Sequence, residues 1–271
     1  MRLFFIFFIC LSQYFSLFAQ KNISGILRDS LSKQPIEFAN IGIIGKNIGT
    51  VTNEKGAFSF NIPDSLLNET IMISIIGYQP KSFSALNFNQ GSVIQLDRDV
   101  TLLAEVEIKP RNTKIKILGN DTKTKSVSTL FNKNNLGAEI AIRLRVKHEG
   151  TELRKFMVNI NRNTLGLPIF RFNVYSVGKD GMPAENLLKQ NILIEPKEKT
   201  GLIELDLIPF GIILNTDIFI AIEWIKDLGN VSGLEFSTKL VGSATYFRQA
   251  SQGQWEKVSP IGVGLHVEVG Y

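Results

Sequence analysis

Apolar and polar residues alternate with a period of two along most of the chain, which is the pattern of half-buried β-strands. In the first hundred residues the alternation is clearest at 58–62 and 71–75, and turn-forming stretches lie at 53–56 and 77–80. Short strands at this spacing favour a β-sandwich over parallel βαβ units, which need long crossover connections. We expect strands near residues 22–28, 36–43, 48–52, 57–62, 69–76, 79–84 and 92–97.

A second alternating series begins after Gly137. Ile140, Ile142 and Leu144 face one way, and Arg143 and Arg145 face the other. Further strand-like runs follow, and one stretch, 183–190, hints at a helical turn; the runs are 170–175, 203–207, 218–225, 237–242, 245–249 and 262–270. Many strands in one domain fit a jelly-roll-like β-sandwich. The fold class is therefore predicted to be all-β, with domains at 20–98 and 137–271.

Residues 1–19 have the layout of a secretory signal peptide. Arg2 precedes an unbroken apolar run at 3–11, and the small residue Ala19 stands at the expected cleavage point. A transmembrane anchor is the first alternative, but this run is shorter than the ~20 residues that cross a bilayer. A lipoprotein is the second, but Cys10 lies inside the apolar run behind large residues. We expect export to the periplasm or to the cell surface and outer membrane.

Cysteine usage and charge narrow the chemistry. Cys10 is the one cysteine of the 271 residues, so cleavage after Ala19 leaves no thiol for a disulfide, a metal site or a nucleophile. The net charge of +5 is concentrated in six basic residues: Lys109, Arg111, Lys114, Lys116, Lys123 and Lys125. One short basic segment does not make a groove for nucleic acid. We interpret 99–136 as a basic linker; the alternative is contact with an anionic envelope surface.

Several short motifs occur in order in the first domain. They are Gly-Ile-Leu-Arg-Asp at 25–29, Gln-Pro-Ile at 34–36, Ala-Asn-Ile at 39–41, Ile-Gly-Thr-Val-Thr-Asn-Glu-Lys-Gly-Ala-Phe at 48–58 and Ile-Ile-Gly-Tyr at 75–78. This order resembles the carboxypeptidase-regulatory-like domain family over about 22–97. The resemblance implies a seven-stranded, transthyretin-like β-sandwich of the kind found at the front of exported and outer-membrane proteins of Gram-negative bacteria. In zinc carboxypeptidases the catalytic groups lie in a separate α/β domain, so the resemblance implies no activity.

The second domain carries a weaker resemblance. Its segments 170–175, 181–183 and 222–224 look like exported two-domain proteins of unassigned function. That likeness brings no known activity with it.

Catalytic motifs are missing from the sequence. His148 and His266 lie far apart in expected strands, and neither has the neighbours of a zinc ligand pair or of a Ser-His-Asp triad. Glu223, beside Trp224, could supply one carboxylate of a glycosidase pair, but no second carboxylate is marked by the sequence. We therefore predict that the protein is not an enzyme and has no cofactor and no metal-site residues; a structural Ca²⁺ bound through scattered loop oxygens is the alternative that stays open.

A binding role has more support. Tyr246, Arg248, Gln252 and Trp255 form an aromatic and polar stretch around the turn at Gly253. Aromatic faces stack on sugar rings while nearby polar groups fix orientation. The alternative is that Trp255 closes the core as a lid. The sequence thus predicts a noncatalytic binding or adaptor protein of the envelope, with a glycan or a surface protein as partner. A hydrolase of envelope glycan or peptide, with the second domain catalytic, is the alternative.

Overall fold

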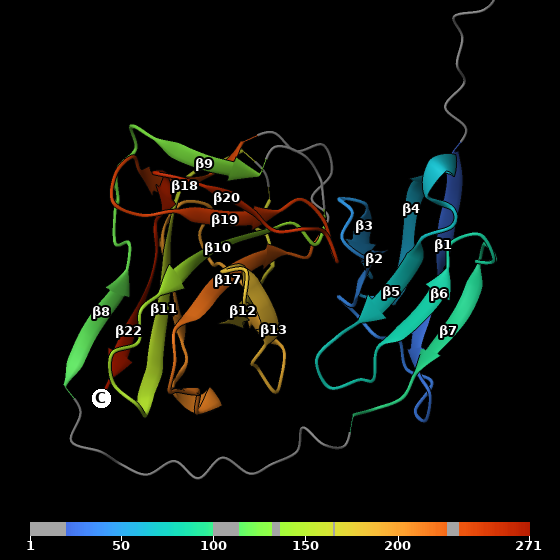
Figure 1. The fold of residues 1–271 in the computed structure, drawn as a ribbon, viewed down its shortest axis with the longest axis horizontal. Coiled ribbons are helices and arrows are strands. Elements are labelled where there is room, and N and C mark those ends of the chain that lie inside the picture. The colour runs from blue at the N-terminus through green and yellow to red at the C-terminus, as the bar shows by residue number, and fades with distance from the viewer. Residues whose placement is uncertain (1–19, 100–113, 132–135, 165, 227–232) are drawn as a thin grey trace, which may run out of the picture.

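The computed structural model describes residues 20–99, 114–131, 136–164, 166–226 and 233–271 (Figure 1). This part of the chain is built from strands and short connections, which confirms the all-β fold class. The predicted signal peptide at 1–19 lies outside the described residues. Within the described ranges, no helix has the length and apolar character needed to cross a bilayer.

The N-terminal domain is a sandwich of a three-stranded and a four-stranded sheet, ordered β4-β1-β7 and β3-β2-β5-β6. Strands lie at each of the seven expected places: β1 (Gln20–Asp29), β2 (Asn40–Ile43), β3 (Gly49–Val51), β4 (Ala57–Pro63), β5 (Thr70–Ser74), β6 (Lys81–Ser84) and β7 (Ser92–Leu96). Inward residues of both sheets, among them Leu27, Ile41 and Ile73, form one buried core. The period-two pattern therefore placed this domain's core correctly.

The turn between β3 and β4 explains the 53–56 motif. The Asn53 side-chain oxygen accepts the backbone N–H groups of Lys55 and Ala57 at 2.9 and 3.0 Å. Gly56 adopts a φ of 72°, which L-residues with a side chain rarely take, and Phe58 turns into the core. The motif is a strand-to-strand turn, as predicted.

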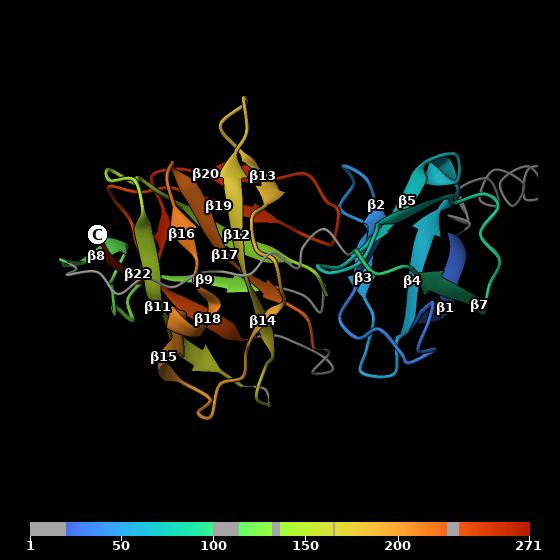
Figure 2. The ribbon, with the colours of Figure 1, turned by 90° about the horizontal axis from the view of Figure 1, so that it is seen from below.

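The C-terminal domain packs two larger sheets face to face (Figure 2). One follows the order β13-β12-β17-β10-β19-β20, with β14 beside β12. Its strands are β10 (Glu139–Leu144), β12 (Phe170–Val177), β13 (Pro183–Asn186), β14 (Ile192–Ile194), β17 (Ile218–Trp224), β19 (Thr245–Arg248) and β20 (Glu256–Val258).

The second sheet follows the order β21-β18-β11-β22-β8, with β9 beside β18 and both β15 and β16 beside β11. Its strands are β8 (Ile115–Gly119), β9 (Ser128–Phe131), β11 (Thr151–Asn163), β15 (Gly201–Asp206), β16 (Ile213–Leu214), β18 (Leu234–Lys239), β21 (Gly262–Val263) and β22 (Leu265–Gly270). Phe156, Phe172 and Trp224 are among the large side chains buried between the two sheets.

Part of the expected basic linker belongs to this domain. β8 pairs with β22, and β9 pairs with β18. The charge run concealed β8 because lysines are tolerated on edge strands, where they discourage pairing with other chains. Lys114, Lys116, Lys123 and Lys125 are exposed there, whereas Lys109 and Arg111 lie outside the described residues. The stretch 183–190, where the sequence hinted at a helical turn, instead contains strand β13.

The two domains touch directly through β2, β3 and their neighbours (Figure 1). Phe38 and Val51 of the N-terminal domain pack on Ile225 of the C-terminal domain. Ser251 Oγ donates to Asn40 Oδ1 at 3.0 Å, and Gln252 Nε2 donates to Ser74 Oγ at 2.7 Å. Apolar packing and polar bonds thus join the domains at one junction.

Candidate functional site

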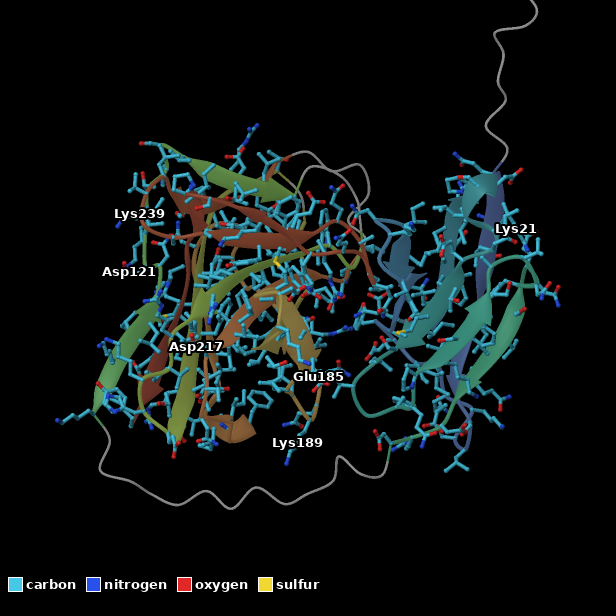
Figure 3. All side chains as sticks on the ribbon, in the orientation of Figure 1. Lys21, Asp121, Glu185, Lys189, Asp217 and Lys239 are labelled. Carbon is cyan, nitrogen blue, oxygen red and sulfur yellow. The ribbon has the colours of Figure 1, made fainter. Side chains whose placement is uncertain are left out.

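The candidate site lies on the face of the β12-β17-β10-β19 sheet that points away from the core. Along β12, Phe170, Phe172 and Val174 enter the core, so Arg171 and Asn173 point the other way. Charged groups elsewhere, such as Glu185 and Lys239, lie at the surface of the domain (Figure 3). On this sheet face, by contrast, the charged side chains of Arg171, Glu223 and Glu139 are buried, and that of Arg248 is partly buried.

These four charges form a row across four strands. Arg171 on β12 stands opposite Glu223 on β17, which stands opposite Glu139 on β10, which stands opposite Arg248 on β19. The order of charges is therefore plus, minus, minus, plus. Cross-strand neighbours have side chains within contact distance. We call Arg171, Glu223, Glu139 and Arg248 the charged row.

Each carboxylate of the row is paired with one arginine. Arg171 Nη1 lies 3.1 Å from Glu223 Oε2, and both side chains are almost wholly buried. Arg248 Nη2 forms a short contact with Glu139 Oε1. The charges of the row thus sum to zero, which is how buried ions are kept in a protein interior.

Two further side chains tie the row together. The Tyr175 hydroxyl donates to Glu139, lying 2.9 and 3.0 Å from its two carboxylate oxygens. Asn173 Nδ2 lies between the two carboxylates, at 3.3 Å from Glu139 Oε1 and 3.1 Å from Glu223 Oε2. Among the described residues, Glu223 Oε1 and the Nε atoms of Arg171 and Arg248 remain without a hydrogen-bond partner.

The row also perturbs the titration of its members. Burial is the largest cause that raises the pKa of Glu139 to about 7; Glu223 adds to it, and Arg248 acts against it. Burial is the largest single influence on Arg248 and opposes its charge, but Glu139, Tyr175 and Glu223 together outweigh it and raise the pKa of Arg248. Burial also raises the pKa of Tyr175 well above its ordinary value.

Three of the four sequence-predicted ligand residues meet on this face. Arg248 belongs to the row, and the ring of Trp255 lies 5.1 Å from its guanidinium carbon and 5.7 Å from the Tyr175 ring. Tyr246 is buried edge-on against Phe219. Trp255 itself is half-buried.

Gln252, the fourth predicted residue, faces the N-terminal domain through its bond to Ser74. Sequence reasoning missed Glu139, Arg171, Asn173 and Tyr175, although it had singled out Glu223. Their alternation with apolar residues was visible at 170–175, but the register that places Glu139 beside Glu223 was not. β10 and β17 are far apart in the sequence, so no short segment of the chain shows that they pair.

The histidines lie apart from this face. His266 is buried on β22, and burial lowers its pKa. His148 was expected in a strand, and this prediction is wrong. It lies in the exposed segment before β11, where its ring stacks on Tyr271 at 4.1 Å. Among the described residues, no group of three or more histidine, cysteine, aspartate or glutamate side chains could hold a metal ion.

Solved structures resemble the chain only distantly. The cysteine protease and lectin-like domains of Cwp84, a surface-layer-associated protein of Clostridium difficile, align at 8% identity with a TM-score of 0.42. That alignment covers 85% of this chain and 58% of the other, so the chain spans less than two thirds of that protein's length. BcpA, the major pilin subunit of Bacillus cereus, aligns at 12% identity and a TM-score of 0.18, covering 90% and 69%. Likenesses at these scores carry no functional argument.

The family comparison is more informative for the first domain. No curated protein matches the chain. Residues 23–108 match the family model of the CarboxypepD_reg-like domain, in agreement with the motifs at 25–78. The N-terminal part of this chain is therefore similar to CarboxypepD_reg-like domains.

Proposed function

We propose that this protein is an exported, noncatalytic binding or adaptor protein of the bacterial envelope, with a carbohydrate as its preferred ligand. One observation carries the proposal: half-buried Trp255 lies over Arg248, and Arg248 is fixed from below by buried Glu139. A half-buried aromatic ring and a held guanidinium beside it form a surface that is ordered before any ligand arrives.

Such a surface suits a sugar ring. The flat apolar face of an indole packs against C–H groups, and a neighbouring charged donor bonds to hydroxyls. Holding these groups in place beforehand reduces the entropy lost on binding. Tyr175, whose ring meets the edge of Trp255, supports the indole from the side. We place the sugar contact at Trp255 and Arg248, with buried Tyr246 in a supporting role.

The two-domain arrangement supports the adaptor part of the proposal. The N-terminal domain contacts the C-terminal sandwich next to the charged row, because Arg171 also donates to the backbone oxygen of Phe38. A ligand held at Trp255 would thus be presented on a body that includes both domains. A surface protein bound to the N-terminal domain would then be linked to that ligand.

The test is a binding panel of envelope polysaccharides with three forms of the protein. We expect saturable binding by the parent protein and by Trp255→Phe, which keeps an aromatic face. We expect Trp255→Ala to lose binding, because one stacked ring accounts for much of such a contact. Equal binding by Trp255→Ala and the parent would show that Trp255 is not the contact. If the parent protein binds no glycan, the carbohydrate part of the proposal is wrong and the ligand to seek is a protein.

A hydrolase is the second candidate, because the structure supplies the carboxylate that the sequence did not mark. Glu139 stands beside Glu223, as the two carboxylates of a glycosidase flank one bond, and its pKa is raised toward that of a general acid. However, both carboxylates are fully buried and each is bonded to an arginine. This arrangement favours a structural role. Glycan turnover that vanishes in Glu223→Gln, with the fold kept, would establish the hydrolase instead.

A further inference from the structure

A second candidate binding site lies inside the C-terminal sandwich, and Glu139 of the charged row is among the residues that line it. A cavity of about 570 Å³ opens where β9 of one sheet faces β19 and β20 of the other. Its size falls within the ~300–1,000 Å³ typical of small-molecule sites. Its walls include Leu130, Phe131, Ile140, Phe247, Val258 and Ile261.

The polar groups of the lining are already bonded within the protein. Thr129 Oγ1 accepts a hydrogen bond from Thr238 at 2.8 Å. Thr245 Oγ1 donates to Ile261 O at 2.9 Å and accepts from Val263 N at 2.9 Å. The carboxylate of Glu139 is held by Arg248 and Tyr175 on the other face of its sheet. The buried part of a ligand would therefore meet hydrocarbon and find few free hydrogen-bond partners.

The cavity is also elongated and has apolar lips. Residues 127–131 form one continuous wall, which at about 3.3 Å per residue is ~13 Å long. Leu130 on β9 is 44% exposed and Val258 on β20 is 37% exposed, so both carry apolar surface into solvent at the opening. A long apolar slot with apolar lips fits a hydrocarbon chain better than a compact polar ring.

The residues at the opening of the cavity indicate the chemistry of the ligand's head, which would lie outside the hydrocarbon slot. Gln249 lines the cavity, and its Nε2 lies 3.4 Å from Glu256 Oε1, where both side chains are exposed. A negative charge at the rim disfavours an anionic head group, whereas hydroxyls can bond to both side chains.

We infer that this cavity binds a single-chain amphiphile with an uncharged, hydroxyl-bearing head, its hydrocarbon chain between the two sheets. This site is separate from Trp255 and does not depend on the proposed glycan contact. Phe131 provides a signal for occupancy, because its ring lies 5.5 Å from that of buried Trp224.

The experiment titrates monododecanoylglycerol into the Trp255→Phe protein and follows the fluorescence of Trp224. We expect a saturable change with one molecule bound per chain. Dodecanoic acid has the same chain with an anionic head, and we expect it to bind more weakly. Maltose should leave the Trp224 signal unchanged. Absence of a saturable change with monododecanoylglycerol would overturn the inference, and tighter binding of dodecanoic acid would contradict the assignment of the head.

Two pairs of variants locate the site. Ala138→Leu adds bulk to the cavity wall, and Ala184→Leu adds the same bulk on exposed β13. Val258→Asp places a charge on the lip, and Ile213→Asp places one on an exposed strand that does not line the cavity. We expect the first member of each pair to weaken binding by about tenfold or more, since a misfit in an apolar pocket costs this much. If the lip variant Val258→Asp binds as tightly as Ile213→Asp, the ligand does not enter here.

Discussion

At the scale of single residues, the charged row is the most unusual feature of the molecule. Charges are seldom fully buried, and a buried ion pair often contributes little net stability because both ions lose their hydration. Breaking such a pair is costly, however, since the remaining ion keeps no partner. The row therefore makes the fold sensitive to each of its members.

Arg171→Met tests this sensitivity. The variant leaves Glu223 buried with Asn173 as its remaining bonded partner, and we expect a loss of about 3–5 kcal/mol in the free energy of unfolding. The matched control is Arg162→Met, which removes an exposed arginine 3.3 Å from Glu235 and should cost about 0–1 kcal/mol. Chemical denaturation measures both values. Equal losses of unfolding free energy in the two variants would show that the fold depends no more on the charged row than on an exposed ion pair.

The raised pKa of Glu139 predicts a pH dependence. A carboxyl whose pKa rises from 4.5 in the unfolded chain to about 7 in the fold binds more protons when folded. Its contribution to stability is therefore complete below pH 4.5 and is lost as the pH rises through 7. This contribution is about 3 kcal/mol at most. Unfolding curves between pH 4.5 and 8 should show this decline in the parent and not in Glu139→Gln; parallel pH profiles would argue against it.

At the scale of elements, alternation predicted the strands of the N-terminal domain well. Each of its seven strands overlaps an expected one, because one sheet face is apolar and the turns carry glycine, proline or asparagine. In the C-terminal domain the pattern did not predict β8, β9 or the long strand β11. β8 is an exposed edge strand whose pattern mixes lysine with isoleucine, and its membership depends on pairing with distant β22.

The sequence predicted part of the candidate site for the same reason. Arg248 and Trp255 were recognised because they lie close together in the chain, and Glu223 because it adjoins a tryptophan. Glu139 is separated from Glu223 by more than eighty residues and joins it only through the β10–β17 register. Asn173, which bonds both, could be predicted only once that register was known.

Asp29 is the last residue of β1, and its lowered pKa gives a second prediction of pH-dependent stability. Its Oδ1 accepts the backbone N–H groups of Ser32 and Leu31, and its Oδ2 accepts from Arg98 and Tyr78. The Ser32 bond and then Arg98 hold the pKa of Asp29 well below its ordinary value.

A carboxyl with a lowered pKa stabilises the fold above its unfolded pKa near 3.8, and this stability is lost as the pH falls through the folded value. We expect Asp29→Asn to lower the melting temperature at pH 7 and to weaken the drop in stability that the parent shows on acidification. Asp64→Asn, at an exposed 3₁₀ turn, is the control and should change neither. Thermal melts from pH 3 to pH 7 measure both effects, and identical behaviour of the two variants would contradict the role of Asp29.

At the scale of the whole molecule, the junction between the domains sets how they are arranged. The backbones of β2 and of the 250–253 loop approach so closely that a Cβ on Gly42 would clash with the carbonyl oxygen of Ser251. This close contact holds the domains in one arrangement, and it requires glycine at position 42 because a side chain would clash.

Gly42→Ala should therefore separate or tilt the domains while each keeps its core. We expect a larger radius of gyration by small-angle scattering and faster proteolysis between the domains. Gly181→Ala is the control, because Gly181 has a positive φ of 78° but open space around its Cβ position. That variant should lose some stability without changing the shape. An unchanged radius of gyration in Gly42→Ala would mean that the junction does not set the domain arrangement.

The most direct test of the proposed binding function uses the two tryptophans as reporters. Trp224 is fully buried and donates its indole N–H to Lys226 O at 2.6 Å, whereas Trp255 is half-buried on the outer sheet face. Their two indole ¹⁵N–H signals can be followed while an envelope glycan that binds in the panel is added. We expect the Trp255 signal to shift in a saturable way and the Trp224 signal to stay in place. A glycan that binds without moving the Trp255 signal would contradict the proposed contact at Trp255.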